Sequence, residues 1–181
     1  MVEDAAEAGA SAKAQIARAA GLVMALFVVS RALGLFREIA ISHQFGTGGE
    51  LDAYLAAFRL PDILFQIVAG GALASAFIPT FAGYLAREDQ AGAWRLASGI
   101  INLVFILTAG FSLLAAVFAP WLAETVIVPG FAPERQALTA RLMRMMLITP
   151  AVFGVSGVVM GILNARQHFL LPALAPILYN L

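Results

Sequence analysis

Three long stretches of this chain contain no charged side chain, and they constrain its fold more than any other feature. They cover residues 63–86, 96–123 and 145–165. Each is long enough for a helix across a hydrocarbon core of about 30 Å, which takes roughly 20 residues. Only 12% of the 181 residues are charged and 61% are hydrophobic, whereas soluble domains are about 25% charged. A membrane barrel would instead alternate apolar and polar residues in segments of about ten. The sequence therefore predicts an all-α fold, a polytopic membrane helical bundle.

The charge-free stretches belong to a series of predicted membrane spans. Together with a first apolar segment that contains two arginines, they give spans near residues 17–42, 52–84, 93–121 and 138–164, and a fifth that begins near 169. We therefore expect about five transmembrane helices. The fifth apolar run reaches Leu181 before it is long enough to cross a membrane. This predicts that the sequence is a fragment, or a truncated reading frame, of a longer protein.

The amino-terminal residues differ in composition from the rest of the chain. Residues 1–15 are polar, rich in alanine and acidic, and they lack the basic start and short apolar core of a cleaved signal. We expect a disordered or weakly helical cytoplasmic tail over residues 1–15 and a transmembrane region over residues 16–181. Positive residues in short loops favour the cytoplasmic side. With the amino terminus inside, the inside segments hold Lys13, Arg18, Arg87, Arg95 and Arg166, and the outside segments hold Arg135 and Arg141.

Charged residues concentrate in the first two predicted spans. An arginine at the centre of a membrane helix costs roughly 2.5–3.5 kcal/mol on insertion-based scales, so Arg31 and Arg37 are expected to face a cavity or a partner. They lie about 120° apart around a helix, which suits one broad chamber. Asp52 and Arg59 are seven residues apart and share a side of the next span, with Asp62 less well aligned. Because guanidinium forks match phosphate geometry, the pattern predicts an anion-binding chamber. Two alternatives remain open: ion pairs between helices, and snorkelling to the membrane surface.

Helix-breaking residues fall within several predicted spans and have two interpretations. They are Pro61, Gly70, Gly71, Pro79, Pro150, Gly154, Pro172 and Pro176. Transporters often build a central site from broken or bent helices. Glycine and proline are also simply more frequent in transmembrane helices than in soluble ones.

Several classes of chemistry find no support in the sequence. The chain has no cysteine and only two histidines, so we expect neither disulfides nor a histidine-rich metal site. Its formal net charge of zero gives no electrostatic argument for nucleic-acid binding. The glycine-rich run at residues 46–49 lacks the Gly-Lys-Ser/Thr ending of a phosphate-binding loop and predicts a tight turn. No nucleophile–base pair or carboxylate dyad is evident, so we expect no enzyme activity and no cofactor.

A series of short motifs resembles the start of the lipid II flippase family (MurJ/MviN). The motifs are the runs Ser30–Glu38, Phe45–Gly46, Asp52–Tyr54, Phe58–Asp62, Ala76–Pro79, Gly161–Arg166 and Pro172–Pro176. Both their order and their spacing agree over roughly residues 20–181. The resemblance implies the multidrug/oligosaccharidyl-lipid/polysaccharide exporter superfamily, with about fourteen spans. This chain would then supply an incomplete first lobe, and the remainder of the same transporter is expected as its partner.

The resemblance implies a function in cell-wall biosynthesis. Family members move an undecaprenyl-pyrophosphate-linked disaccharide-peptide across the bacterial cytoplasmic (inner) membrane by alternating access. The family's cavity arginines map onto Arg31 and Arg37 and its cavity aspartate onto Asp52, while Arg59 matches a basic position. The implied substrate-binding residues are therefore these four. The chain departs from the family twice: a basic position of the second span is Phe65 or Gln66 here, and an acidic position ahead of a glycine is Gly70.

Other functions remain as alternatives to lipid II transport. The chain could belong to a flippase for another polyprenyl-linked saccharide, or it could be a structural membrane module that does not transport. An exporter of drug cations would need carboxylates unopposed by arginine, and the deep charges here are basic. An enzyme acting on prenyl phosphates would need a metal-binding acidic motif or a base in the loops, and the sequence offers neither.

Overall fold

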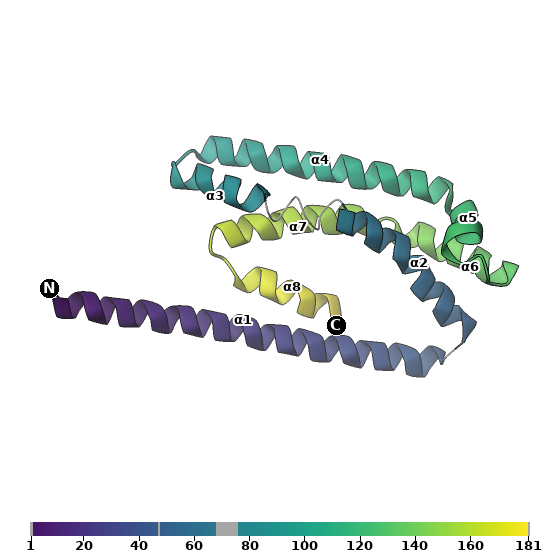
Figure 1. The fold of residues 1–181 in the computed structure, drawn as a ribbon, viewed down its shortest axis with the longest axis horizontal. Coiled ribbons are helices and arrows are strands. Elements are labelled where there is room, and N and C mark those ends of the chain that lie inside the picture. Colours follow the sequence, from purple (N-terminus) through teal and green to yellow (C-terminus); the bar gives the residue numbers. More distant parts are fainter. Residues whose placement is uncertain (1, 47, 68–75, 181) are drawn as a thin grey trace. The chain divides into compact units, whose positions relative to one another are not determined.

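The described part of the chain is helical and contains no strand, in agreement with the predicted fold class. The computed structural model describes residues 2–46, 48–67 and 76–180, with side chains from Gly21 onward except that of Phe45. Its elements are α1 (Val2–Phe45), α2 (Gly49–Phe65), α3 (Ile78–Ala86), α4 (Gln90–Val117), α5 (Ala119–Leu122), the π-helical turn η3 (Ala123–Ile127), α6 (Pro133–Met146), α7 (Thr149–Ala165) and α8 (Leu170–Asn180) (Figure 1).

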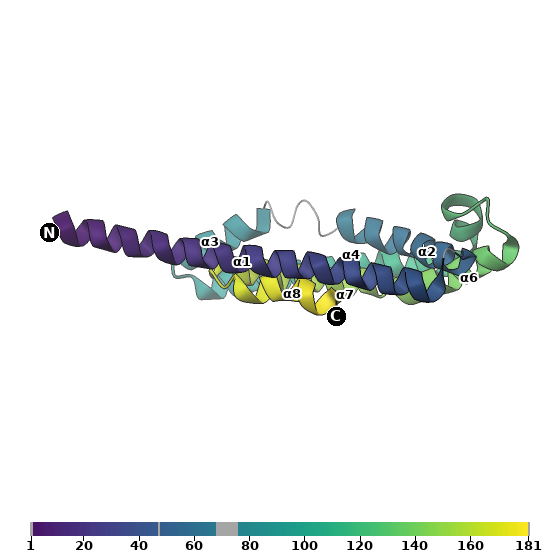
Figure 2. The ribbon, with the colours of Figure 1, turned by 90° about the horizontal axis from the view of Figure 1, so that it is seen from below.

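The chain divides into two compact units, and each is described here by itself. The first comprises residues 1–41 and 168–181, and the second comprises residues 42–167. In the first unit, α8 lies alongside the second half of α1, and both views of the molecule show the two helices side by side (Figure 1 and Figure 2). The second unit contains α2 to α7.

Among the described residues, two helical stretches are long and apolar enough to cross a membrane, judged by length and composition. They are Gln90–Val117 and Pro133–Ala165, and the second combines α6 and α7. At about 1.5 Å per residue the 28 residues of α4 extend about 42 Å, more than a hydrocarbon core needs. These stretches match the spans predicted near 93–121 and 138–164. The total of about five spans stays a prediction, because residues 68–75 of the second span lie outside the described residues.

The predicted tail is helical in the structure. Helix α1 begins at Val2 and continues without interruption to Phe45. Residues 2–15 therefore join the first predicted span in one helix, and no change of secondary structure marks residue 15 or 16. The division into a cytoplasmic tail and a transmembrane region stays a prediction.

Small residues contribute to the helix contacts of the second unit. Helix α2 packs on α6 through a cluster that contains Ala56, Ala57 and Ala140, and α4 packs on α3 and α7 through a cluster that contains Phe81 and Val158. Without a hydrophobic driving force in lipid, small residues promote association because they let helix backbones approach closely. The alanine-rich and glycine-rich composition of the spans therefore serves packing.

The helix-breaking residues differ in their effect. Pro150 lies at the start of α7, just after the break that separates α6 from α7, so the fourth predicted span is divided there. Pro61 is buried inside α2 and Pro176 lies inside α8, and both helices continue through them. Gly70 and Gly71 lie outside the described residues. At the turn predicted for residues 46–49, α1 ends at Phe45 and Gly46 has a φ of 65°, which glycine tolerates best, while Thr47 lies outside the described residues.

Candidate functional site

A polar notch between α1 and α8 is the candidate functional site, and it lies within the first unit. It is a cavity of about 440 Å³ lined by Phe27, Ser30, Arg31, Gly34, Leu35, Arg37, Glu38, Pro176, Tyr179 and Asn180. Arg31 and Arg37, which the sequence predicted as binding residues, both line it. We call this cavity the α1–α8 notch. Its volume falls in the range of small-molecule sites, about 300–1,000 Å³.

The sequence of α1 explains why α8 packs at this position. Ser30, Gly34 and Arg37 follow one another at intervals of four and three, which places them on one helical face. Asn180 of α8 donates from Nδ2 to both the carbonyl and the Oγ of Ser30, each at 3.1 Å. A Cβ atom on Gly34 would lie 3.4 Å from Oδ1 of Asn180. The small side chains of this face therefore let the amide of Asn180 reach the backbone of α1.

Arg37 interacts with Tyr179, the residue before Asn180. Its Nη1 donates a hydrogen bond to the carbonyl oxygen of Tyr179 at 3.3 Å. Its Cζ lies 5.0 Å from the centroid of the Tyr179 ring, within the distance of a cation–π contact. Arg37 therefore makes a hydrogen bond and a cation–π contact with α8, and neither involves a carboxylate.

Arg31 and Glu38 occupy the neighbouring face of α1 and are both exposed. Within each unit, no ion pair joins the described side chains, so the predicted alternative of interhelical ion pairs is not found there. Two guanidinium groups and one carboxylate line the notch, which leaves one net positive charge. Each guanidinium carries five N–H donors and no acceptor. The notch is therefore suited to an anion with several oxygen atoms.

Asp52 and Arg59 lie on α2 in the second unit, and both are exposed. The buried residues of α2 include Ala53, Ala56 and Ala57. The side chains of Asp52 and Arg59 are therefore not part of the buried contact between α2 and α6. Their participation in one chamber with Arg31 and Arg37 stays a prediction.

Sequence reasoning missed Tyr179 and Asn180. A signal was present, because they carry the only polar side chains among residues 169–181. A buried or lipid-facing asparagine in an apolar helix is expected to find a hydrogen-bond partner on a neighbouring helix. The partner itself lies 150 residues away in sequence, so the pattern within this segment could not identify it.

The chain departs from the family pattern at Phe65 or Gln66, where the family has a basic residue. Neither side chain carries a positive charge. Phe65 packs edge-on against Phe153, with ring centroids 6.1 Å apart. Gln66 donates from Nε2 to Oδ2 of Asp62 at 2.7 Å. The second departure, Gly70, lies outside the described residues.

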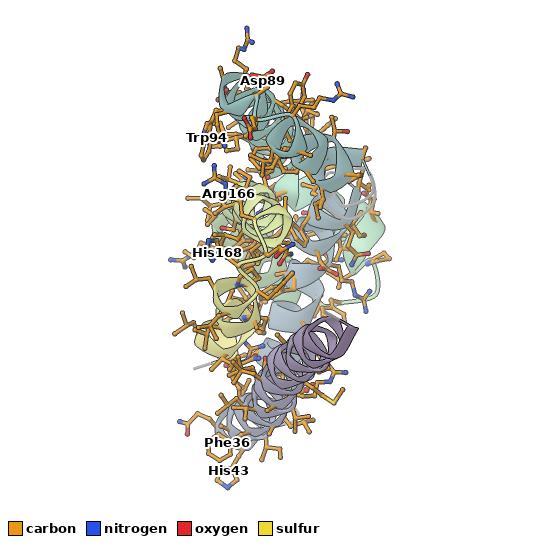
Figure 3. The ribbon with its side chains drawn as sticks, turned by 90° about the vertical axis from the view of Figure 1, so that its left-hand side faces the viewer. Phe36, His43, Asp89, Trp94, Arg166 and His168 are labelled. Carbon is orange, nitrogen blue, oxygen red and sulfur yellow. The ribbon has the colours of Figure 1, made fainter. Side chains whose placement is uncertain are left out.

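Two further arginines stabilise contacts between helices of the second unit. Nε of Arg144 donates to the carbonyl of Ala116 at 3.0 Å, in the last turn of α4, where carbonyls lack partners within the helix. Arg166 lies over the ring of Trp94, with Cζ 5.1 Å from its centroid, and Figure 3 shows the two side chains close together. Arg166 also donates to Oε1 of Gln90 at 3.4 Å. Both arginines therefore join neighbouring helices, and neither of them lines the α1–α8 notch.

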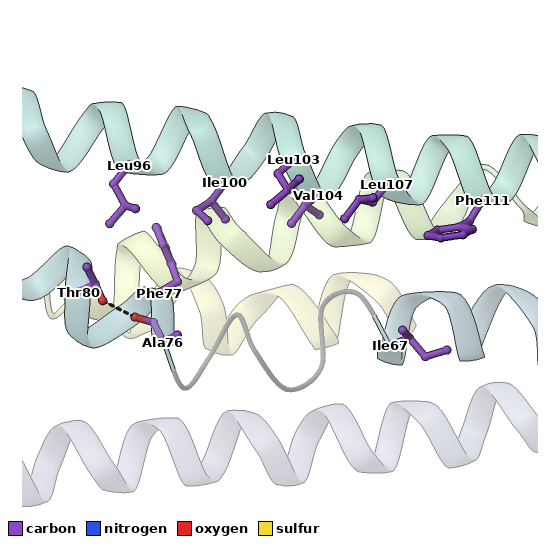
Figure 4. A pocket seen from close by; sticks show the side chains of 10 residues that line it. All are labelled: Ile67, Ala76, Phe77, Thr80, Leu96, Ile100, Leu103, Val104, Leu107 and Phe111. Carbon is purple, nitrogen blue, oxygen red and sulfur yellow. Dashed lines mark hydrogen bonds between the residues drawn. The ribbon is translucent and has the colours of Figure 1, made fainter.

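The second unit contains an apolar groove of about 510 Å³. Its lining is Ile67, Ala76, Phe77, Thr80, Leu96, Ile100, Leu103, Val104, Leu107 and Phe111 (Figure 4). The hydroxyl of Thr80 donates to the carbonyl of Ala76 at 2.6 Å. None of the described residues that line this groove is charged, so they cannot neutralise an anionic group. Across the described residues, no group of three or more His, Cys, Asp or Glu side chains gathers to hold a metal ion.

Comparison with known proteins identifies close similarity to one family. Residues 41–181 match the family described as Lipid II flippase MurJ. The "Probable lipid II flippase MurJ" of Bdellovibrio bacteriovorus is 34% identical over 170 residues, which cover 92% of this chain and 32% of that protein. The corresponding protein of Rhizobium tropici is 32% identical over 154 residues, with 84% of this chain and 29% of that protein covered.

A third relative is the "Lipid II flippase MurJ" of Burkholderia cenocepacia, which is 30% identical over 165 residues and matches across 90% of this chain and 32% of its own length. The chain thus spans about three tenths of the length of the curated relatives it matches. No solved structure matches the chain.

Proposed function

This chain belongs to the lipid II flippase MurJ family, and on that premise we propose that it takes part in moving lipid II across the bacterial cytoplasmic membrane. The cargo is an undecaprenyl-pyrophosphate-linked disaccharide-peptide, and the movement proceeds by alternating access. The proposed location is the inner membrane, with several passes through it. Since the chain spans about three tenths of its relatives, the activity belongs to a flippase of their length in which this chain forms one region.

The observation that carries the proposal is the pair of arginines in the α1–α8 notch. Arg31 and Arg37 line one cavity of about 440 Å³. A pyrophosphate presents several oxygen atoms and more than one negative charge, and guanidinium groups bind such oxygens bidentately. We assign pyrophosphate binding to these two residues. The prenyl tail stays in the lipid beside the helices, because its transfer to a polar site would be unfavourable.

Asp52 and Arg59 have a secondary role in this proposal. They modulate the electrostatic field of the cavity, or they pair with one of the notch arginines when the transporter changes between its inward-open and outward-open states. A site that binds its substrate equally in both states cannot drive release, so a competing partner or an altered cavity must weaken the arginine contacts. The exposed charged face of α2 supports this assignment, because its side chains are not committed to packing.

The alternatives find less support. The relatives described above carry lipid II in their names, which does not favour another polyprenyl-linked saccharide. A structural module held together by ion pairs is disfavoured by the lack of such pairs among the described side chains within each unit. We assign the chain to transport rather than to catalysis.

The test is charge removal in the full reading frame that carries this chain. Arg31→Ala and Arg37→Ala should abolish lipid II translocation in a strain that depends on the variant, with insertion into the membrane unchanged. Arg87→Ala is a matched control, because Arg87 is an exposed arginine in a turn outside the notch. Translocation is measured as lipid II that becomes accessible on the outer face of the membrane.

The controls decide how a loss is interpreted. Immunoblotting of membrane fractions must show equal amounts of each variant. Normal growth and translocation with either Arg31→Ala or Arg37→Ala as the sole copy would contradict the assignment of the notch. A loss with Arg87→Ala as well would indicate a general requirement for positive charge.

A further inference from the structure

The guanidinium of Arg37 is held by Tyr179 in a way that leaves most of its donors unused. One N–H of the guanidinium is donated to the Tyr179 carbonyl, at 3.3 Å. The contact with the Tyr179 ring, at 5.0 Å, uses the guanidinium's positive charge and needs none of its N–H groups. Since a guanidinium has five N–H groups, Arg37 can keep both contacts while it donates to an anion.

The position of Tyr179 is fixed by the residue that follows it. Asn180 donates to the carbonyl and hydroxyl oxygens of Ser30 at 3.1 Å and to the carbonyl of Pro176 at 3.0 Å. Ser30 is buried, with 6% of its surface exposed. These hydrogen bonds fix the position of α8 along α1. Because Arg37 lies on α1 seven residues after Ser30, the ring of Tyr179 then lies beside Arg37.

A fixed arginine binds an anion better than a freely rotating one. An arginine side chain has several rotatable bonds, and binding an anion with a free side chain removes that freedom. A side chain that is already oriented loses less freedom on binding. The aromatic ring orients the guanidinium at no cost in hydrogen-bond donors.

On the basis of the proposed flippase function, we propose that Tyr179 is a positioning residue of the substrate site. Its aromatic ring orients the Arg37 guanidinium in the α1–α8 notch so that the remaining N–H groups face the pyrophosphate of the cargo. Tyr179 acts through Arg37 and makes no contact of its own with the phosphate oxygens. The segment 168–181, which carries only uncharged residues apart from His168, thereby contributes to recognition of a charged group.

The experiment compares ring-retaining and ring-removing variants of the full-length protein in nanodiscs, with lipid II as the ligand. Tyr179→Leu should weaken lipid II binding about two- to fivefold, the effect of losing one exposed cation–π contact of about 0.5–1 kcal/mol. Tyr179→Phe and Tyr179→Trp keep an aromatic face and should restore most of the affinity. Phe36→Leu is the matched control: it removes an exposed ring from α1 (Figure 3), and Phe36 is not among the residues that line the notch.

A double-mutant cycle with Arg37→Ala separates positioning from a general packing role. If Tyr179 acts through Arg37, Tyr179→Leu should cause little further loss once Arg37→Ala is present. The maximal translocation rate at saturating lipid II should change less than the affinity. Thermal unfolding of each variant, followed in the same nanodiscs, identifies variants that fail to fold.

The outcomes distinguish this inference from the function on which it rests. If Arg37→Ala leaves lipid II binding unchanged, the assignment of the notch itself is wrong. If Arg37→Ala weakens binding but Tyr179→Leu does not, or does so equally with and without Arg37, the positioning role is overturned. A folded Tyr179→Phe variant as weak as Tyr179→Leu would also overturn it, because the ring would then not be the functional group.

Discussion

At the scale of single residues, three arginines of this chain contact backbone carbonyls or aromatic rings. Arg37 donates to the carbonyl of Tyr179 and Arg144 to that of Ala116, while Arg166 lies over Trp94. An arginine in a membrane helix costs roughly 2.5–3.5 kcal/mol on insertion-based scales, and such contacts offset part of that cost. Unlike a carboxylate partner, a carbonyl or a ring leaves the positive charge of the guanidinium uncancelled. Arg37 therefore remains able to attract an anion.

A single side chain caps the start of α4, and its removal should lower stability. Oδ1 of Asp89 accepts a hydrogen bond from the backbone N–H of Gly92 at 2.7 Å. Asp89→Ala leaves that N–H without its partner and should cost about 0.5–2 kcal/mol, whereas Asp89→Asn keeps an acceptor and should cost less. The measurement is the thermal unfolding midpoint of the full-length protein in detergent. Arg87→Ala, two residues earlier in the same turn, is the control, and an equal shift for both alanine variants would contradict the capping role.

The two arginines that line the α1–α8 notch could be singled out from the sequence, but the residues of α8 that contact this face of α1 could not. Arg31 and Arg37 stand out because arginine is rare and costly in an apolar helix. Tyr179 and Asn180 are uncharged and lie in a short apolar run, 142 residues after Arg37 and 150 residues after Ser30. Which helix packs on the small face of α1 depends on tertiary structure, and spacing along one helix carries no information on it.

At the scale of helices, α4 and α7 pack closely at Gly154. A Cβ atom added to Gly154 would lie 2.7 Å from Cγ1 of Val104, which is closer than real Cβ contacts permit. Thr108, one turn later on α4, is buried and donates its hydroxyl to the carbonyl of Val104 at 2.6 Å. Both backbones must therefore stay close, and the absence of a side chain at Gly154 is required by packing.

Matched glycine substitutions on α7 test this contact. Gly154→Val should destabilise the protein by about 1–3 kcal/mol, because the added methyl groups overpack a filled interface. Gly157→Val is the control, because nothing lies within 4 Å of a Cβ at Gly157, three residues later on the same helix. Unfolding midpoints in detergent provide the comparison. A Gly157→Val variant as unstable as Gly154→Val would show that valine propensity, and not the α4–α7 contact, determines the result.

Helix positions were more predictable than helix ends and breaks. The charge-free run at residues 96–123 predicted a span near 93–121, and α4 covers Gln90–Val117. The span predicted near 138–164 is divided at residues 147–148. Its hydrophobicity is continuous across the break, so composition alone could not reveal it. Proline gave an ambiguous signal, because α2 continues through Pro61 whereas α7 starts around Pro150.

At the scale of the whole molecule, the family assignment and the helical membrane fold agree with each other. The family match covers residues 41–181 and thus includes both stretches that are long enough to span a membrane. Arg31 and Arg37 precede the matched residues. Their assignment therefore depends on the geometry of the α1–α8 notch and on the resemblance of the run Ser30–Glu38 to the family, and the charge-removal experiment tests both.

The predicted orientation leads to a test of topology. Helix α4 begins after the turn at residues 87–89, and the short elements α5 and η3 lead from its end to the turn at residues 128–132. Because α5 and η3 are too short to cross a membrane, a single crossing by α4 places the two turns on opposite sides. The distribution of arginines predicts that the first turn is cytoplasmic. Because the chain has no cysteine, a single introduced cysteine can be labelled without background from this chain. Arg87→Cys should react with a membrane-impermeant maleimide only after the membrane is permeabilised, whereas Gly130→Cys should react in intact spheroplasts. The reverse pattern would invert the orientation, and labelling of both sites in intact spheroplasts would contradict a membrane-spanning α4.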